Sequence, residues 1–265
     1  MKIIITIIIF FVFILLYSIG ENEMVIEMDK INVSLVTIYD NYQSNEKLKT
    51  GWGFSCLIRT NKEKILFDTG ADSETLLYNM EQLGVEAKEI DTVVLSHIHG
   101  DHTGGLSGIL KKKPAKVYAL ESFPNDFKNE IKSYGSEIVE ISESIKISDG
   151  IYTTGELGTW LKEQSLIINT EKGLVVITGC AHPGIVNIVK EVKRLANEDV
   201  YLVLGGFHLS GETDSSIRDI IKSLRDLGVK KIAPCHCSGD RARELFKEEY
   251  RDDFISNGVG KIIEV

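Results

Sequence analysis

The sequence is poor in the residues that mark disulfide-rich or linker-rich proteins. Only 4 prolines and 4 cysteines occur among 265 residues. Four cysteines are too few for a disulfide scaffold, and so few prolines argue against long disordered linkers. Basic side chains are also in deficit, since 30 lysines and arginines face 39 acidic residues. The formal charge of −9 disfavours binding to nucleic-acid phosphates, so we expect no nucleic-acid partner.

A long uncharged run follows the first two residues. Residues 3–19 are dense in Ile, Phe and Leu, and a segment apolar on all sides needs hydrocarbon around it. We therefore interpret residues 1–20 as a cleaved signal peptide or an uncleaved membrane anchor, with a buried first strand or helix as the alternative. Lys2 would keep the N-terminus in the cytoplasm and place the remainder outside it, anchored or secreted.

Residues 21–265 contain no repeat, low-complexity stretch or linker, and we interpret them as one domain. Apolar alternation and β-branched runs predict strands at 31–39, 54–59, 64–67, 92–95, 116–120, 137–141, 165–169, 174–178, 201–204 and 261–265. Helical periodicity predicts helices at 73–83, 124–134, 185–196, 215–227 and 241–248. Strands come first as a meander and then alternate with helices, an order that roughly repeats. This predicts two mixed sheets packed together with helices outside.

Four ligand-type side chains fall within six positions after an apolar strand. His97 and His99 project from the same side of an extended chain. Gly100 then allows a turn that brings Asp101 and His102 towards a second point nearby. Imidazole and carboxylate groups at this spacing suit two divalent cations that share a water.

The other three histidines each lie at a strand end rich in Gly or Pro. These are His182, His208 and His236, and together they indicate a shared site with the first cluster. Cysteines flank two of them, at Cys180, Cys235 and Cys237, and are either soft ligands or small buried residues. The aromatic residues nearest these loops are Trp52, Trp160 and Phe207, which either wall a flat substrate or pack in the core.

The pattern His97-x-His99-x-Asp101-His102 resembles that of the metallo-β-lactamase superfamily, with Asp68-Thr69-Gly70 before it and His182 and His236 after it. The resemblance implies an αββα sandwich with two divalent metal ions, zinc before manganese or iron, at one edge of the sheets. His97, His99 and His182 would hold one ion. Asp101, His102 and His236 would hold the other, and Asp68 would brace the ligand loop.

More narrowly, five segments are similar to the branch of dihydropterin–ribofuranosylaminobenzene-5′-phosphate synthases. They are residues 51–55, 163–166, 179–187, 205–209 and 234–239. One departure concerns the strand end where much of the superfamily places a bridging aspartate. Here Gly205-Gly206-Phe207-His208 offers no carboxylate. His208 is therefore either a ligand or a group that faces the substrate as an acid, a base or an anion-binding side chain.

A different enzyme class shares one of these motifs. Asp68-Thr69-Gly70 also resembles the catalytic turn of retroviral-type aspartic proteases. Those enzymes need two such aspartates that share a proton, whereas this chain has one Asp-Thr-Gly, and the six histidines would be unexplained. We therefore set this interpretation aside.

The chemistry predicted is metal-assisted hydrolysis, with a metal-activated hydroxide attacking an ester, lactone or phosphoester. Asp101 and His208 are the predicted catalytic residues. Because Asp101 is the only anionic ligand in the set, the site should attract a small anionic substrate. Two alternatives stay open: a transferase like the pterin synthases of the branch, and a non-catalytic metal-dependent binding or sensing protein.

Overall fold

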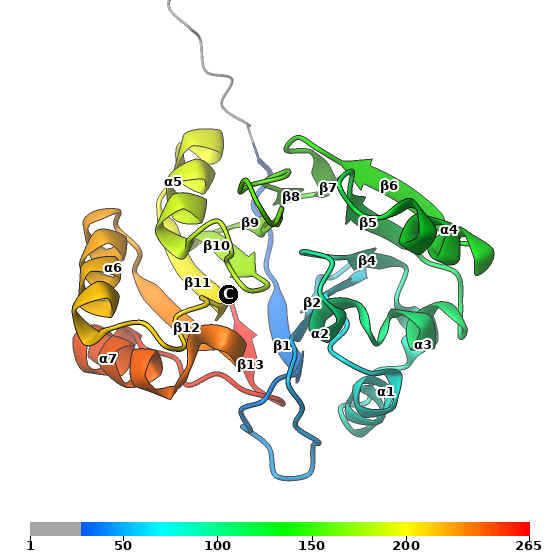
Figure 1. Cartoon of the computed structure of the whole chain (residues 1–265), viewed down its shortest axis with the longest axis horizontal. Coiled ribbons are helices and arrows are strands. Elements are labelled where there is room, and N and C mark those ends of the chain that lie inside the picture. Colours follow the sequence, from blue (N-terminus) through cyan, green and yellow to red (C-terminus); the bar gives the residue numbers. More distant parts are fainter. Residues whose placement is uncertain (1–27) are drawn as a thin grey trace, which may run out of the picture.

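The computed structural model describes residues 28–265 (Figure 1). The predicted signal peptide or anchor at residues 1–20 lies outside this part of the chain. Within residues 28–265, none of the helices has both the length and the apolar character needed to cross a membrane.

A seven-stranded sheet is built from the first half of the chain and its last strand. Its order is β13-β1-β2-β3-β4-β5-β6. The strands are β1 (Ser34–Tyr39), β2 (Ser55–Arg59), β3 (Lys64–Phe67), β4 (Thr92–Val94), β5 (Lys116–Leu120), β6 (Glu137–Ile141) and β13 (Ile262–Glu264). The first strands form an antiparallel meander, and β3 to β6 then run parallel to one another.

A six-stranded sheet follows, in the order β12-β11-β10-β9-β8-β7. Its strands are β7 (Lys146–Ser148), β8 (Ile151–Thr153), β9 (Leu166–Thr170), β10 (Gly173–Thr178), β11 (Val200–Gly206) and β12 (Lys231–Cys235). Here β10, β11 and β12 are parallel neighbours. Strands β10 and β11 are buried on both faces, which explains their Val, Ile and Leu runs.

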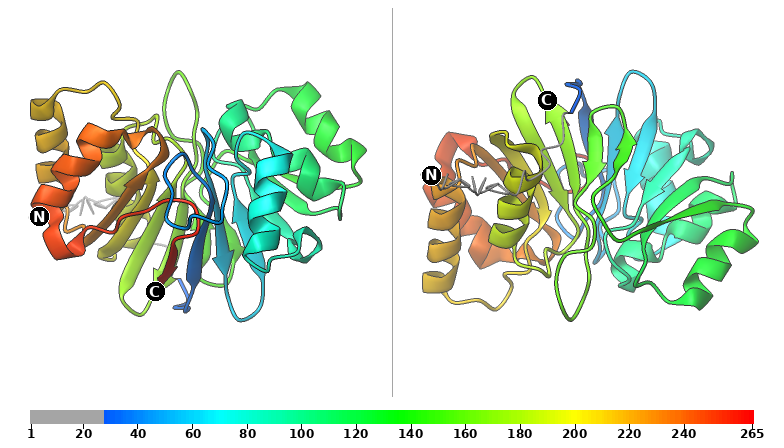
Figure 2. Two further views of the ribbon diagram at one scale, coloured as in Figure 1. Left: turned by 90° about the horizontal axis from the view of Figure 1, so that it is seen from below. Right: turned by 90° about the horizontal axis from the view of Figure 1, so that it is seen from above.

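Helices cover the outer face of each sheet (Figures 1 and 2). On the seven-stranded side lie α1 (Ser73–Gln82), α3 (Leu106–Leu110) and α4 (Asn125–Ser133), with the short α2 (Gly100–Thr103) near the sheet edge. On the other side lie α5 (Ile185–Ala196), α6 (Asp214–Asp226) and α7 (Asp240–Tyr250). Three short 3-10 turns complete the described elements, η1 (Ala87–Glu89), η2 (His236–Ser238) and η3 (Arg251–Asp253).

The core lies between the two sheets and beneath each helix layer. Side chains of β1 to β5 pack against Val175 and Ile177 of β10 and Leu202 and Leu204 of β11. A second cluster joins the outer face of the six-stranded sheet to α5, α6 and α7. The predicted αββα sandwich is therefore confirmed, with most predicted elements within a few residues of their observed bounds. The strands β7, β8 and β12 were not predicted.

Helix α1 shows how the local sequence defines an element of this fold. Asp72 is its N-cap, and the carboxylate accepts the Thr75 amide at 2.7 Å. Its other oxygen accepts the Tyr39 hydroxyl at 2.7 Å, which ties the helix start to β1. Leu76 and Met80 are buried against the sheet, as the predicted apolar face requires.

The topology concentrates the loops that carry the predicted site residues. Carboxyl ends of neighbouring parallel strands meet at one edge of a sheet. Asp68 follows β3 and His97 follows β4, while His182, His208 and His236 follow β10, β11 and β12. Both sheets thus direct histidine-bearing loops towards one edge of the sandwich.

Candidate metal centre

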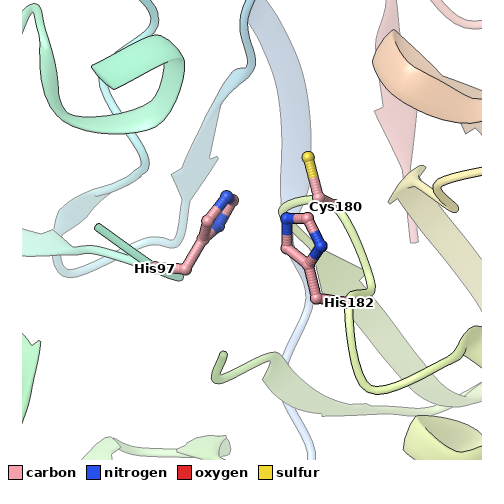
Figure 3. A group of neighbouring side chains, drawn as sticks. All are labelled: His97, Cys180 and His182. Carbon is pink, nitrogen blue, oxygen red and sulfur yellow. The ribbon is translucent and has the colours of Figure 1, made fainter. Parts of the chain in front are cut away.

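Three histidines from the two sheets converge at that edge. The His97 and His99 ring centroids are 4.7 Å apart, and those of His97 and His182 are 4.9 Å apart. Nε2 of His97 lies 3.2 Å from Nδ1 of His99. In Figure 3, His97 projects from the side of the seven-stranded sheet towards His182, which comes from the loop after β10. The three rings of the predicted first ligand set therefore lie side by side.

The Asp68 carboxylate determines which nitrogen carries the proton in His97 and in His102. It accepts the Ser96 amide and the Ser96 hydroxyl, each at 2.7 Å, and Nδ1 of His102 at 2.7 Å. Because the Ser96 hydroxyl donates to Asp68, its oxygen accepts Nδ1–H of His97 at 2.9 Å. In the neutral rings, Nε2 of both His97 and His102 is then the unprotonated nitrogen, the form in which imidazole binds a metal.

The second predicted ligand set also comes together. Oδ2 of Asp101 lies 3.3 Å from Nε2 of His236 and 3.7 Å from Nε2 of His102. Nδ1 of His236 faces Oδ1 of Asn41 at 3.3 Å, so its Nε2 is the free nitrogen. Partial burial raises the pKa of Asp101, but the short contact with His236 and the nearby His102 outweigh it and lower the pKa to about 2.

The chemistry of these donors fits divalent cations. Nε2 of His182 and Nε2 of His236 are buried atoms that make no hydrogen bond. Burial, followed by the neighbouring histidines, holds the pKa of His97 well below its usual value and lowers that of His182 to about 4. Imidazoles with buried, unpartnered nitrogens are suited to bind metal ions.

Cys180 is closer to both ligand sets than the sequence indicated. Its Sγ lies 3.2 Å from Nε2 of His102. Within residues 28–265, three groups of side chains have metal-binding geometry, and Cys180 belongs to all of them: His97, Cys180 and His182; His102, Cys180 and His236; and Cys180, His208 and Cys237. Figure 3 shows the thiol beside the His182 ring, opposite His97. The pattern of residue spacing alone does not reveal this central position.

Glu163 is a second residue whose role the sequence did not show. It is fully buried, and its Oε1 accepts the amides of Gly179, Cys180 and Ala181 at 2.8–3.0 Å. Its Oε2 accepts the His182 amide at 2.8 Å. Burial raises the pKa of Glu163 to about 7, against the lowering effect of these amides. One carboxylate thus holds the backbone of the whole loop after β10.

Backbone strain concentrates at the same place. Asp68, Ala181, His208 and His236 have φ between 49° and 59°, a region that L-residues other than Asn and Asp rarely enter. Such conformations cost free energy and persist where the surrounding structure enforces them. Their clustering at one sheet edge is typical of a functional site.

The outer residues of the site differ in exposure. His208 is exposed, and its ring lies 4.5 Å from that of His182. Trp160 is 91% exposed and lines a cavity of about 560 Å3 that reaches His182 and Asn187. Trp52 is 57% exposed, and its ring centroid is 4.9 Å from that of His236. Both tryptophans can therefore contact a ligand.

Phe207 belongs to the core instead of to the wall of a pocket. It is 1% exposed and packs against Phe246 of α7, with ring centroids 5.6 Å apart. Its backbone follows β11, where alternation turns its side chain towards the helices while His208 faces out. Of the two interpretations that the sequence allowed for Phe207, the structure favours core packing.

Together, the fold and the site define a metalloenzyme class built on an αββα sandwich. The metallo-β-lactamase superfamily profile matches residues 52–192, and the chain belongs to this superfamily. A relative from Methanocaldococcus jannaschii, named 7,8-dihydropterin-6-methyl-4-(β-D-ribofuranosyl)-aminobenzene-5′-phosphate synthase, is 34% identical over 91% of this chain and 99% of its own length. An uncharacterised protein of the same organism is 33% identical over 80% of this chain and 92% of its own length.

Solved structures agree with this assignment. Tm1679, described as a metal-dependent hydrolase of the β-lactamase superfamily, has a TM-score of 0.75 and 30% identity, covering 88% of this chain and 99% of its own. YhfI from Bacillus subtilis, at 15% identity, shares the fold with a TM-score of 0.63 over 89% of this chain and 100% of its own.

Proposed function

We propose that the protein is a metal-dependent hydrolase that acts on a small anionic ester, lactone or phosphoester. The observation that carries the proposal is the convergence of the two predicted ligand sets, whose free nitrogens Nε2 of His182 and Nε2 of His236 are buried without a hydrogen-bond partner. Membership of the metallo-β-lactamase superfamily supports it.

The residues present would hold two cations, preferably zinc, with manganese or iron as alternatives. His97, His99 and His182 would hold one, and Asp101, His102 and His236 the other. Bound divalent cations lower the pKa of a shared water and polarise the bond to be cleaved. Asp68 keeps His102 in the tautomer that presents Nε2, and through Ser96 it does the same for His97.

The charge of the site supports an anionic substrate. Asp101 is the only carboxylate in the predicted ligand set, and the histidines are neutral donors. Two dications would therefore leave the centre positive, although the chain as a whole has a formal charge of −9. His208, exposed beside His182, is placed to donate a hydrogen bond to a bound anion or a proton to its leaving group.

The cavity next to His182 is the place for the rest of the substrate. Its volume of about 560 Å3 is within the range of small-molecule sites. Trp160 supplies an exposed aromatic face and Asn187 an amide at its edge. A substrate with a flat ring joined to an anionic group would use both parts of this site.

The second candidate function is a pterin-forming transferase. The M. jannaschii relative with a synthase name aligns with 91% of this chain, which is the observation that favours it. In that case the centre would activate an electrophile for attack by an amine or carbon nucleophile rather than by water. Product formed from a hydroxymethyl-pterin diphosphate and an aminobenzene phosphate would identify this activity.

Metal analysis combined with a substrate panel tests the proposal. Purified protein should bind between one and two equivalents of metal, and the metal-loaded protein should hydrolyse at least one of a panel of phosphodiesters, lactones and esters. His99→Ala should lose most of the metal, because it removes one of three ligands. Metal binding without any turnover would favour the binding or sensing protein, and no metal binding at all would contradict both.

The cellular location of the protein would distinguish the hydrolase from the transferase. The export or anchoring role proposed for residues 1–20 fits an extracytoplasmic hydrolase better than a cytosolic synthesis pathway. A reporter fused after residue 30 should therefore be found outside the cytoplasmic membrane. A reporter in the soluble cytoplasm would move the transferase ahead of the hydrolase.

A further inference from the structure

We propose that Cys180 is a metal ligand whose thiolate would be shared by the two predicted cation positions. The inference rests on the proposed metal-dependent function and decides between the two roles, soft ligand or small buried residue, that the sequence left open for Cys180. It also narrows the choice of metal.

The position of the Cys180 sulfur is the first observation. Its ligand atom lies within 4.8 Å of those of His97 and His182, and equally within 4.8 Å of those of His102 and His236. The sulfur therefore belongs to both predicted cation positions, with Nε2 of His102 only 3.2 Å away. In Figure 3 the sulfur lies beside His182 with His97 opposite. Among the described cysteines, Cys56 and Cys235 belong to none of these groups.

The two glycines at the end of β11 have no room for a carboxylate side chain. A Cβ atom at Gly206 would lie 2.4 Å from the Gly179 carbonyl oxygen and 2.7 Å from Sγ of Cys237. At Gly205 a Cβ would lie 2.1 Å from the Thr178 carbonyl oxygen. Backbone atoms cannot yield as the tip of a flexible side chain can, so neither position accepts an aspartate.

The loop after β10 holds Cys180 in place for this purpose. Glu163 accepts the Cys180 amide at 2.9 Å and the amides of Gly179, Ala181 and His182 as well. The Cys180 side chain is buried, and the sulfur faces the imidazoles rather than the apolar core. A ligand whose backbone is fixed by four hydrogen bonds loses little freedom when it binds a cation.

The negative charge and the soft sulfur of a Cys180 thiolate would influence which metal the site binds. Together with Asp101 it would supply a second negative charge, so two dications would still leave the centre positive. Thiolate ligands favour zinc, cobalt and cadmium over manganese and magnesium. We therefore expect zinc to be selected over manganese when both are offered at equal concentration.

Cobalt substitution tests the inference with a readout independent of turnover. Thiolate bound to Co2+ gives an intense charge-transfer absorption in the near ultraviolet, which imidazole and carboxylate ligands do not give. The wild-type protein loaded with Co2+ should show this band, and C180S should lose it. C180S should also bind the second equivalent of Zn2+ at least about 10-fold more weakly, as expected when a metal site loses a supporting group.

Two other cysteines provide the matched controls. C56S removes a buried thiol of β2 that is remote from the ligand groups, and it should keep the band. C237S removes the thiol nearest Cys180 and should also keep it. A band that persists in C180S and disappears in C237S would overturn the assignment in favour of Cys237.

The remaining outcomes separate this inference from the proposed function. Wild-type protein that binds cobalt without a thiolate band overturns the inference and leaves the metal-dependent hydrolase intact. Protein that binds neither cobalt nor zinc overturns both. If C180S does not fold, as judged by circular dichroism, the 113Cd resonance of cadmium-loaded wild-type protein decides: a shift typical of sulfur ligation supports the inference, and one typical of nitrogen and oxygen ligation overturns it.

Discussion

Glu163 accepts the backbone amide of His182 at 2.8 Å through Oε2, while its Oε1 accepts the three amides that precede it. A predicted ligand thus owes its placement to a carboxylate that lies on a different segment. Since all four donors are backbone groups, the carboxylate defines the path of the loop rather than the orientation of one ring.

Glu163→Gln tests this relationship. The side-chain amide of glutamine would bring N–H groups towards the His182 amide, so two donors would face each other in a buried position. We expect the free energy of unfolding to fall by about 1–3 kcal/mol, the usual cost of an unsatisfied buried group. Metal occupancy, measured by elemental analysis, should fall as well. Glu143→Gln, at an exposed position, is the control and should change neither quantity.

Asp68, which follows β3 of the seven-stranded sheet, also supports the centre, and Asp68→Asn should weaken metal binding. Asp68 accepts three hydrogen bonds at 2.7 Å, from the Ser96 amide, the Ser96 hydroxyl and Nδ1 of His102. Asparagine replaces one acceptor oxygen with a donor, so the tautomers of His97 and His102 are no longer enforced. Metal affinity should fall by about 10- to 100-fold, as measured by competition with a chromophoric chelator.

The control for Asp68 is the exposed Asp149→Asn, which loses only surface ion pairs. Equal metal affinity in Asp68→Asn and wild-type protein would show that the carboxylate is dispensable for the centre and would leave it a purely structural residue.

His208→Ala should separate chemistry from metal binding. The ring is exposed beside His182, which suits a group that protonates a leaving group or binds an anion. We expect the variant to keep its metal and to lose roughly 100-fold or more in turnover of the best substrate from the panel. Metal content and rate must be measured on the same sample. A parallel loss of both would make His208 a ligand, in the group it forms with Cys180 and Cys237.

Asp72, which lies outside the predicted ligand sets, should make the stability of the fold depend on pH in the acid range. Partial burial raises the pKa of this carboxyl, but the Thr75 amide and the Tyr39 hydroxyl outweigh it, so the pKa is lowered from 3.8. The folded state is therefore stabilised by the carboxylate above its unfolded pKa, and this contribution is lost as the pH falls through the lowered folded value.

Asp72→Ala should accordingly lose about 1 kcal/mol of unfolding free energy near neutral pH, as expected for a helix N-cap. The difference from wild type should shrink as the pH is lowered below 3.8. Urea denaturation at both pH values measures it. A difference that is constant with pH would mean that the ionised carboxylate is not the source of the stabilisation.

Strand β12 shows why part of the fold escaped prediction. It contains Pro234, which cannot donate to a ladder and usually argues against a strand. Here β12 is an edge strand, paired only with β11 within the six-stranded sheet, so the missing N–H faces no partner strand. The three-residue strands β7 and β8 lack the run of three apolar residues, Val93 to Leu95, that marks the equally short β4. Longer strands and amphipathic helices were predicted because their periodicity is local.

The residues of the site likewise fall into those that local spacing predicted and those that it did not. His97, His99, Asp101 and His102 lie within one short segment, so their spacing alone predicted a metal centre. Glu163 and Cys180 could not be recognised in this manner. The amides that Glu163 holds are 16 to 19 residues away in sequence. The position of Cys180 between the histidines depends on how the loop after β10 meets the loop after β4.

Each of the two predicted ligand sets takes side chains from both layers of the sandwich, and this affects more than catalysis. A cation held by His97 and His182 would cross-link the seven-stranded and six-stranded sheets at one edge, closing a long loop of the chain as a disulfide does. Removal of the metal would break this cross-link, and the two sheets could then separate at that edge. Resistance of the fold to heat and proteases would therefore depend on free metal concentration, and the protein's lifetime would follow the metal supply of its surroundings.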